Sequence, residues 1–128
     1  TCQRNIRVHS DGNVKMRGDK DKIRQLLLIL IDNAIKYSKE PIDVRVRAAK
    51  SAVKIEVTDY GIGVPEHEIP YLFERFYRVD NARRRTTGGS GLGLSIAKKI
   101  IDMHEGKVEV YSKPGNGTTI SIQLPRNL

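Results

Sequence analysis

Asp59 is the residue whose position most clearly suggests chemistry. Apolar and polar residues alternate from Val53 to Val57, and the same period of two sends the Asp59 side chain toward the interior. A carboxylate in that place needs a polar partner. It could cap the turn that follows, but Gly61 and Gly63 come directly after it and let backbone approach a flat ligand. The group suggests a site in which the carboxylate accepts a hydrogen bond from an exocyclic amine, such as that of adenine.

Thr118 is a second candidate for the same site. It has the parity of Ile120, Ile122 and Leu124, so its hydroxyl should also face inward and could hold a water or a ligand near Asp59. An ordinary strand threonine explains the position equally well.

Asn33, Lys36 and Tyr37 are spaced three and four apart and should share one face of a helix. That face offers an amide oxygen, a cation and an aromatic ring. An amide oxygen can bind Mg²⁺ when phosphates supply most of the negative charge, and an ammonium group neutralises phosphate further. Taken alone, the three residues are also compatible with an ordinary solvated helix face.

The glycine-rich run before the second expected helix predicts an anion site. Free backbone amides and the amino terminus of that helix should point at one place. The run lacks the Gly-Lys-Ser/Thr ending of a P-loop, and it follows an arginine-rich segment instead of the strand of a dinucleotide-binding fold. Its members are Gly88, Gly89, Ser90, Gly91, Leu92, Gly93 and Leu94.

Hydrophobic periodicity predicts the strands that must position these residues. Alternation of apolar and polar residues on either side of turn-forming residues indicates three strand pairs, each with one face toward a core. They are residues 6–8 with 14–16, 42–48 with 53–58, and 108–110 with 120–124.

Two amphipathic helices accompany the strands. Asp19 suits the N-cap of a helix that ends near Tyr37. A second helix should place Leu92, Ile96, Ile100 and Met103 on one side and end near Gly106. The sum predicts a two-layer α+β sandwich, with a mixed, mostly antiparallel sheet and about three helices on one face.

Length and composition suit one folded domain of residues 1–128. The net charge of +8 attracts polyanions, but the sequence has no nucleic-acid recognition motif and no aromatic interleaving. Cys2 is the single cysteine, and the longest apolar run, Leu26 to Ile31, is too short to cross a bilayer. We therefore expect a domain in the cytoplasm that contacts neither nucleic acid nor membrane directly.

Together these residues resemble the catalytic, ATP-binding domain of bacterial sensor histidine kinases, within the wider group that shares the Bergerat ATP-binding fold. The resemblance extends over nearly the whole chain and rests on five boxes in the family's order. Asp32 to Tyr37 look like the N box, Asp59 to Gly63 the first glycine box, Phe73 to Arg78 the F box, Gly89 to Leu94 the second glycine box, and Gly115 to Thr118 the short final one.

The resemblance implies a role for each matching position. Asn33 would bind Mg²⁺, Lys36 phosphate, Tyr37 the adenine ring and Asp59 the adenine amine. The segment from Tyr77 to Gly89 would be a mobile ATP lid. The implied catalytic residues are Asn33, Lys36, Arg83 and Arg85, and the implied ATP-binding residues are Asn33, Lys36, Tyr37, Asp59, Gly61, Gly63, Tyr77, Arg78, Gly89, Ser90, Gly91, Leu92, Gly93, Leu94 and Thr118.

Ile29 departs from the family pattern. Four residues before Asn33 the family often has a polar residue, and the related ATPases have a glutamate base. Hydrolysis needs an activated water, whereas a neutral imidazole already has a nucleophilic lone pair, so the loss harms an ATPase more than a histidine kinase.

The accepting histidine of this family lies on a helical dimerisation domain, and no segment of this chain resembles it. His9, His67 and His104 are expected to be structural or exposed. We therefore expect a domain that binds Mg²⁺ and ATP and transfers the γ-phosphate to a histidine on a separate domain. A response regulator would be the partner of the intact kinase, and the parent protein would be anchored in the cell membrane. The alternatives are another ATPase or serine kinase of the same fold, or a nucleotide-binding docking module without transfer.

Overall fold

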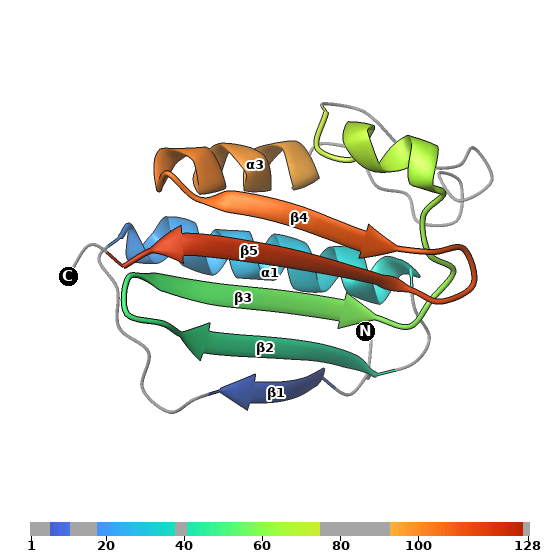
Figure 1. Cartoon of the computed structure of the whole chain (residues 1–128), viewed down its shortest axis with the longest axis horizontal. Helices are drawn as coiled ribbons and strands as arrows, with labels where there is room; N and C mark the ends of the chain where they lie inside the picture. Colours follow the sequence, from blue (N-terminus) through green and yellow to red (C-terminus); the bar gives the residue numbers. More distant parts are fainter. Residues whose placement is uncertain (1–5, 11–17, 38–40, 75–92, 127–128) are drawn as a thin grey trace.

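The computed structural model describes residues 6–10, 18–37, 41–74 and 93–126, without the side chains of Lys36 and Tyr37. The described strands form a five-stranded sheet in the order β1-β2-β3-β5-β4 (Figure 1). The elements are β1 (Ile6–Ser10), α1 (Lys20–Tyr37), β2 (Ile42–Ala48), β3 (Ala52–Asp59), the 3-10 helix η1 (Glu66–Tyr71), α3 (Gly93–Met103), β4 (Lys107–Ser112) and β5 (Thr118–Pro125).

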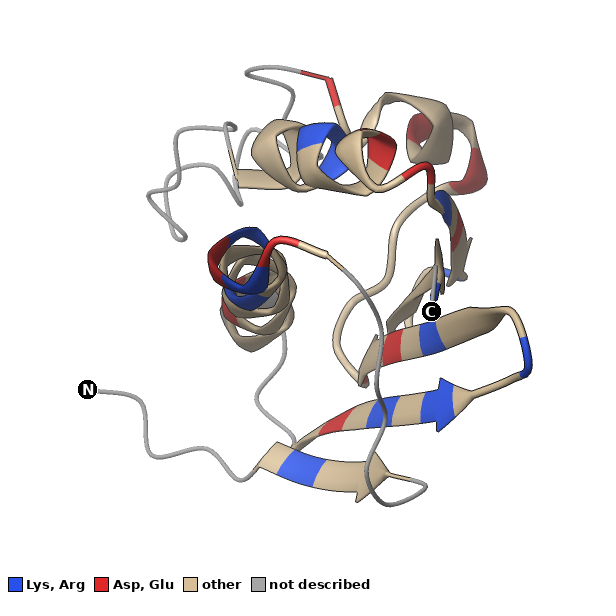
Figure 2. Cartoon of the chain, turned by 90° about the vertical axis from the view of Figure 1, so that its left-hand side faces the viewer, with Lys and Arg blue, Asp and Glu red and all other residues tan. Residues whose placement is uncertain are grey.

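The α-helices α1 and α3 pack against each other and cover the same face of the sheet (Figure 2). Between the two layers lies a core of aliphatic side chains, in which Leu26, Leu30, Ile101, Ile122 and Leu124 are fully buried. All described strand pairs are antiparallel except β1 with β2, which run parallel. The predicted two-layer α+β sandwich with a mixed sheet is therefore confirmed.

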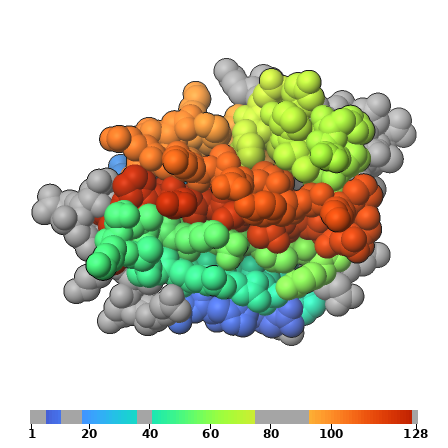
Figure 3. Space-filling model, viewed as in Figure 1, coloured from blue at the N-terminus to red at the C-terminus, as the bar shows by residue number. Residues whose placement is uncertain are grey.

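The opposite side of the sheet, here called the open face, carries the alternate residues of each strand. In β3 these are Lys54, Glu56 and Thr58, each at least partly exposed, between the buried Val53, Ile55 and Val57. Figure 3 shows the strands lying side by side on this surface of the molecule. No helix in the described part of the chain combines the length and the hydrophobicity that crossing a bilayer requires.

The start of α1 confirms the predicted cap. The Asp19 Oδ1 atom accepts hydrogen bonds from the backbone amides of Asp21 and Lys22, both at 3.1 Å. Those donors have no partner inside the helix, so the carboxylate satisfies them and favours the start of α1 at this residue.

His104, which follows α3, joins the two helices. Its Nδ1 atom lies 2.8 Å from the Ile100 carbonyl oxygen, and its Nε2 accepts the backbone amide of Asp19 at 3.1 Å. Because one ring nitrogen must donate and the other accept, the arrangement fits a neutral ring with its proton on Nδ1. His104 therefore has a structural position, as expected from the sequence.

The apolar side expected for the second helix is only partly buried in α3. Ile100 is buried, but Ile96 is 38% exposed and Met103 is 62% exposed. The other buried positions are Ser95, Ala97 and Ile101. Ser95 and Ala97 are small, so a search for large apolar side chains does not identify them as buried. Leu92 lies outside the described residues.

The predicted pairing of the first strand also needs correction. Residues 6–10 do form a strand, but β1 pairs with β2, with Ile6 opposite Ile42 and Val8 opposite Val44. The residues 14–16 that were expected to pair with it lie outside the described part of the chain. The hairpins β2–β3 and β4–β5 are both confirmed.

The turn between β4 and β5 lies against the segment that follows β3. Gly117 has a φ of 81°, and a β-carbon there would collide with the backbone carbonyl of Asp59. Gly63 has a φ of 74°, and a β-carbon there would collide with the carbonyl of Lys113. Glycine at both positions therefore permits a backbone contact that any side chain would prevent.

Gly117→Ala and Gly115→Ala form a matched pair that tests this contact. Gly115 has a similar φ of 85°, but a β-carbon there would meet no atom within 4 Å. We expect Gly115→Ala to cost about 1 to 2 kcal/mol of unfolding free energy from backbone strain alone. Gly117→Ala should cost a further 1 to 3 kcal/mol, roughly, because of the collision. Urea denaturation measures both, and equal losses would contradict the proposed contact.

Candidate functional site

The predicted site residues that the structure describes come from element ends that meet at one end of the molecule. Figure 1 shows the carboxyl ends of α1 and β3 and the amino ends of β5 and α3 on the same side. These ends contain Asn33, Asp59, Thr118 and Gly93 respectively. The sheet register places Asp59 directly opposite Thr118.

Asp59 faces the interior as its parity predicted, with 4% of the residue exposed. Its Oδ1 atom accepts the backbone amide of Gly61 at 3.0 Å. Burial raises the pKa of the Asp59 carboxyl above its ordinary value, although hydrogen bonds from the Gly61 and Thr118 backbone amides oppose the shift. None of the described lysines or arginines forms an ion pair with it. A carboxylate can accept about four hydrogen bonds, so it retains capacity for a donor from a ligand.

Thr118 is buried beside Asp59 and belongs to a hydroxyl network. The Ser112 hydroxyl donates to the Gly117 carbonyl oxygen at 2.9 Å and accepts the Val64 backbone amide at 2.7 Å. Its single proton is thereby used, so the contact of 2.8 Å between Ser112 Oγ and Thr118 Oγ1 requires Thr118 as the donor. The Thr118 oxygen can then act toward a ligand only as an acceptor.

Asn33 is half-buried on α1, and Ile29 lies one helical turn before it. A β-carbon on Gly93 would lie 3.6 Å from Cγ2 of Ile29, so this face of α1 meets the amino end of α3. Ile29 packs against the hydrophobic core. The position where related ATPases have a glutamate therefore adjoins the site and supplies no base.

The start of α3 at Gly93 confirms that the glycine-rich run leads into a helix. The first backbone amides of a helix have no partner within it and attract anions. Leu94 is half-buried and packs against the core, as does Phe73 of the expected F box.

Several predicted site residues cannot be placed. The backbones of Lys36 and Tyr37 belong to α1, but their side chains are not described. The remaining predicted residues of the lid and the second glycine box lie outside the described part of the chain; they are Tyr77, Arg78, Arg83, Arg85, Gly89, Ser90, Gly91 and Leu92. Their roles stay predictions.

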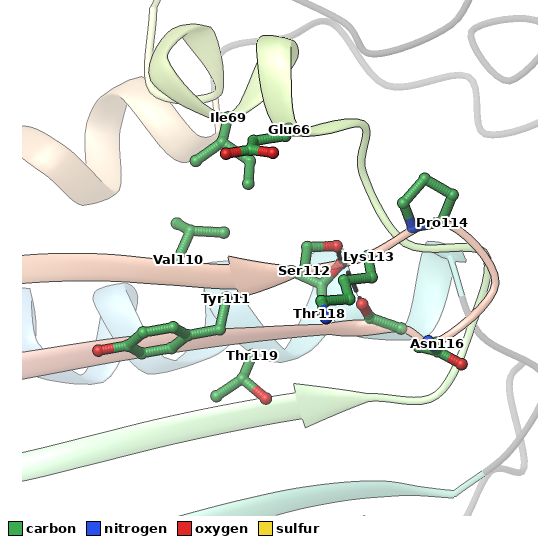
Figure 4. Close-up of a pocket in the computed structure, with 11 residues that line it drawn as sticks. Glu66, Ile69, Val110, Tyr111, Ser112, Lys113, Pro114, Asn116, Thr118 and Thr119 are labelled. Carbon is green, nitrogen blue, oxygen red and sulfur yellow. Dashed lines mark hydrogen bonds between the residues drawn. The ribbon is translucent and has the colours of Figure 1, made fainter.

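A groove of about 820 Å³ opens beside this site, between η1 and β4 (Figure 4). Ile69 and Glu66 of η1 lie on one side of it, and Val110 and Ser112 of β4 on the other. Among the predicted site residues that the structure describes, Thr118 alone lines it. The groove therefore adjoins the Asp59 site but does not coincide with it.

Sequence reasoning missed Ser112 and Val64. Ser112 has the inward parity of Val108 and Val110, and the register of the final hairpin places it opposite Thr118. That parity could have identified the hydroxyl pair. Nothing in the sequence indicated that the Val64 amide would complete the network.

The raised pKa of Asp59 predicts how stability depends on pH. The folded chain holds this proton more tightly than the unfolded chain, so Asp59 reduces stability increasingly as the pH rises above about 4. Asp59→Asn keeps the shape and a carbonyl acceptor without the buried charge. We expect the variant to have the higher free energy of unfolding at pH 7, and the difference to shrink as the pH falls toward about 4. Urea denaturation across this range measures both, and a less stable variant at pH 7 would contradict the prediction.

Comparison with known proteins agrees with this geometry. A family model described as "Histidine kinase-, DNA gyrase B-, and HSP90-like ATPase" matches residues 18–128. The sensor histidine kinase YkoH of Bacillus subtilis is 51% identical over 123 residues, which are 95% of this chain and 27% of YkoH. The chain spans about a quarter of the length of the curated relatives that it matches first.

Solved structures give the same result. The nucleotide-free catalytic domain of histidine kinase ThkA has a TM-score of 0.81 at 26% identity, covering 97% of this chain and 81% of that one. Full-length ShkA in complex with AMPPNP has a TM-score of 0.82 at 25% identity, covering 98% of this chain and 26% of that one. The family match extends over α1, η1, α3, β2 to β5 and every site residue in the described part of the chain, so the chain belongs to the histidine kinase-, DNA gyrase B- and HSP90-like ATPases.

Proposed function

We propose that this domain binds ATP with Mg²⁺ and transfers the γ-phosphate to a histidine on a separate domain of its parent kinase. The observation that carries the proposal is the buried Asp59 carboxylate at the end of β3 in a chain of this family. The similarity to sensor histidine kinases such as YkoH supports the transfer step.

The adenine base would bind at Asp59. The exocyclic amine of adenine would donate to the carboxylate and stabilise its ionised form, which burial alone disfavours. The Thr118 oxygen supplies a second acceptor, directly or through a water. Gly61 and Gly63 belong to the turn that would approach the base.

The phosphates would bind toward the amino end of α3. The helix start at Gly93 provides backbone amides and the positive end of the helix dipole. Asn33 would contribute an amide oxygen to Mg²⁺, whose other ligands would include phosphate oxygens. Lys36 on phosphate, Tyr37 against the adenine, and Arg83 and Arg85 in the lid are proposed partners on the strength of the family resemblance.

Transfer of the γ-phosphate to a histidine requires positioned reactants and neutralised charge, and it requires no general base on this domain. A neutral imidazole nitrogen attacks the γ-phosphorus as the bond to the β,γ-bridging oxygen breaks, and ADP leaves. The apolar Ile29 beside Asn33 is compatible with this reaction, because no water has to be activated. The protein would hold the reacting groups in line and neutralise the developing charge.

The proposed partners follow from the same reaction. The first is the dimerisation domain that contains the accepting histidine, and the second is a response regulator that receives the phosphoryl group from the intact kinase. We place this domain in the cytoplasm, where ATP is available, within a parent protein anchored in the membrane.

A nucleotide-binding docking module without transfer is the second candidate. The observation in its favour is Ile29, which leaves the site without a base next to Asn33. Another ATPase or serine kinase of the same fold is disfavoured by the same residue and by the F box resemblance.

Binding is the first test of the proposal. We expect calorimetry to detect ATP binding to this chain in the presence of Mg²⁺, and Asp59→Asn to weaken it roughly 10- to 100-fold through loss of a charge-assisted hydrogen bond. Ser51→Ala, on the connection between β2 and β3 at the opposite end of β3, is the matched control and should bind as the parent does. If the unsubstituted chain does not bind ATP, the proposal is overturned.

Transfer is the second test. The histidine-containing dimerisation domain of the parent kinase is added in trans with γ-labelled ATP, and acid-labile, base-stable label on that domain is measured. At a limiting ATP concentration we expect label with the unsubstituted chain and roughly 10- to 100-fold less with Asp59→Asn. ATP binding without label would favour the docking module, and release of labelled phosphate alone would favour an ATPase.

A further inference from the structure

A cluster of polar side chains surrounds Asp43 on the open face of the sheet. The Arg7 guanidinium donates to both carboxylate oxygens, from Nε to Oδ1 at 2.8 Å and from Nη2 to Oδ2 at 2.9 Å. The Tyr60 hydroxyl donates to Oδ2, and His9 Nε2 lies 3.2 Å from Oδ1. Although it lies on the open face, Asp43 is only 3% exposed. The cluster joins β1, β2 and the residue directly after β3.

The electrostatics make this cluster a firm anchor. The Arg7 hydrogen bonds and then the Tyr60 hydrogen bond hold the pKa of Asp43 well below its usual range, so the carboxylate is ionised at neutral pH. The same hydrogen bond raises the pKa of Tyr60, which keeps the phenol protonated as a donor. Bidentate arginine contacts to a carboxylate are among the stronger polar contacts in proteins. The Arg7 guanidinium also lies 6.0 Å from the centre of the Tyr60 ring.

Tyr60 connects this anchor to the proposed adenine site. Asp59 points into the interior, whereas the next residue, Tyr60, reaches Asp43 on the open face. The following residue, Gly61, donates its amide to the Asp59 carboxylate. The backbone around Asp59 is therefore held from both faces of the sheet, by Gly61 on the inside and by Asp43 on the outside.

Burial alone does not hold this turn. Tyr60 is 43% exposed, and the turn continues into the exposed Ile62 and into Gly63 at positive φ. Ordering such a segment costs conformational entropy, which specific contacts have to offset. One of them is the Gly115 amide, which donates to the Ile62 carbonyl oxygen at 2.7 Å. The hydrogen bond from Tyr60 to Asp43 is the polar contact on the open face that restrains the residue next to Asp59. A carboxylate that must receive an amine needs its position held to within about 0.5 Å.

We propose that Tyr60, held by the Asp43–Arg7 pair, is a positioning residue for Asp59 and thereby strengthens recognition of the amine of an adenine nucleotide. The inference rests on the proposed function and deepens it. It predicts that changes on the open face, outside the nucleotide site, weaken binding only of those nucleotides that have the amine.

The test uses Tyr60→Phe, with Tyr111→Phe as the matched control. The Tyr111 hydroxyl also donates to a carboxylate on the open face, that of Glu109, but on β4 and away from the turn after β3. Dissociation constants are measured by calorimetry for ATP and for purine riboside triphosphate, which lacks the amine. We expect Tyr60→Phe to weaken ATP about 3- to 10-fold and the purine analogue less than about 2-fold. Tyr111→Phe should change neither.

A second variant and a second measurement keep the result independent of folding. Arg7→Gln removes the bidentate contact while Tyr60 remains, and it should weaken ATP in the same selective way if Tyr60→Phe does not fold. Amide hydrogen exchange at Gly61 without nucleotide should accelerate several-fold in either variant, with the melting temperature confirming a folded chain.

Each outcome decides the proposal. Selective loss of ATP affinity with faster Gly61 exchange supports it. Equal loss for both nucleotides would show general damage and overturn it, as would unchanged ATP affinity. A parent chain that binds no ATP would overturn the proposed function itself, and this inference with it.

Discussion

The burial of one carboxylate at the end of β3 is the constraint on which the rest of this structure depends. An ionised group inside a protein costs free energy unless hydrogen-bond donors surround it. The donors to Asp59 are the backbone amides of Gly61 and Thr118, which come from a turn and from another strand. The Gly61 amide lies two residues after Asp59 and needs no other segment. The Thr118 amide comes from β5, and Gly117 before it lets the β4–β5 turn approach the backbone of Asp59, because it has no side chain. The turn and the register of β5 thus support a single acidic side chain.

The two faces of the sheet have different roles at the end of β3. Alternation along β3 sends Asp59 toward the helices, and Tyr60 directly after it reaches the open face. On the inner face, the Asp59 carboxylate has backbone donors and a raised pKa, which is compatible with a site that accepts a further hydrogen bond from a ligand. Outside, Asp43 has a full set of partners and a lowered pKa, which suits a permanent anchor. Two buried aspartates on opposite faces therefore have opposite electrostatic characters because their partners differ.

Local sequence patterns predicted the elements and the inward direction of Asp59 and Thr118, because period and parity need no knowledge of distant segments. The pairing of β1 with β2 could not be read in this way, since parallel strands are joined by a long connection. The buried side of α3 was also missed, because Ser95 and Ala97 do not form a hydrophobic stripe. In the sequence, Asp43 alternates with apolar residues as a solvent-exposed charged residue would. Its role as a buried anchor becomes visible only from the positions of Arg7 and Tyr60 in the folded chain.

The direction of one hydroxyl adds chemical selectivity to this arrangement. Because Ser112 donates its proton to the Gly117 carbonyl, Thr118 must donate to Ser112 and can only accept from a ligand. Asp59, ionised, is also an acceptor only. In the proposed adenine site, two neighbouring acceptors would favour the amine of adenine, whereas the carbonyl oxygen that guanine has at the same ring position would meet two acceptors without a proton between them. Rejection of guanine would then arise mainly from buried acceptors left without a donor. Such unpaired polar groups discriminate between ligands more strongly than lost contact area does.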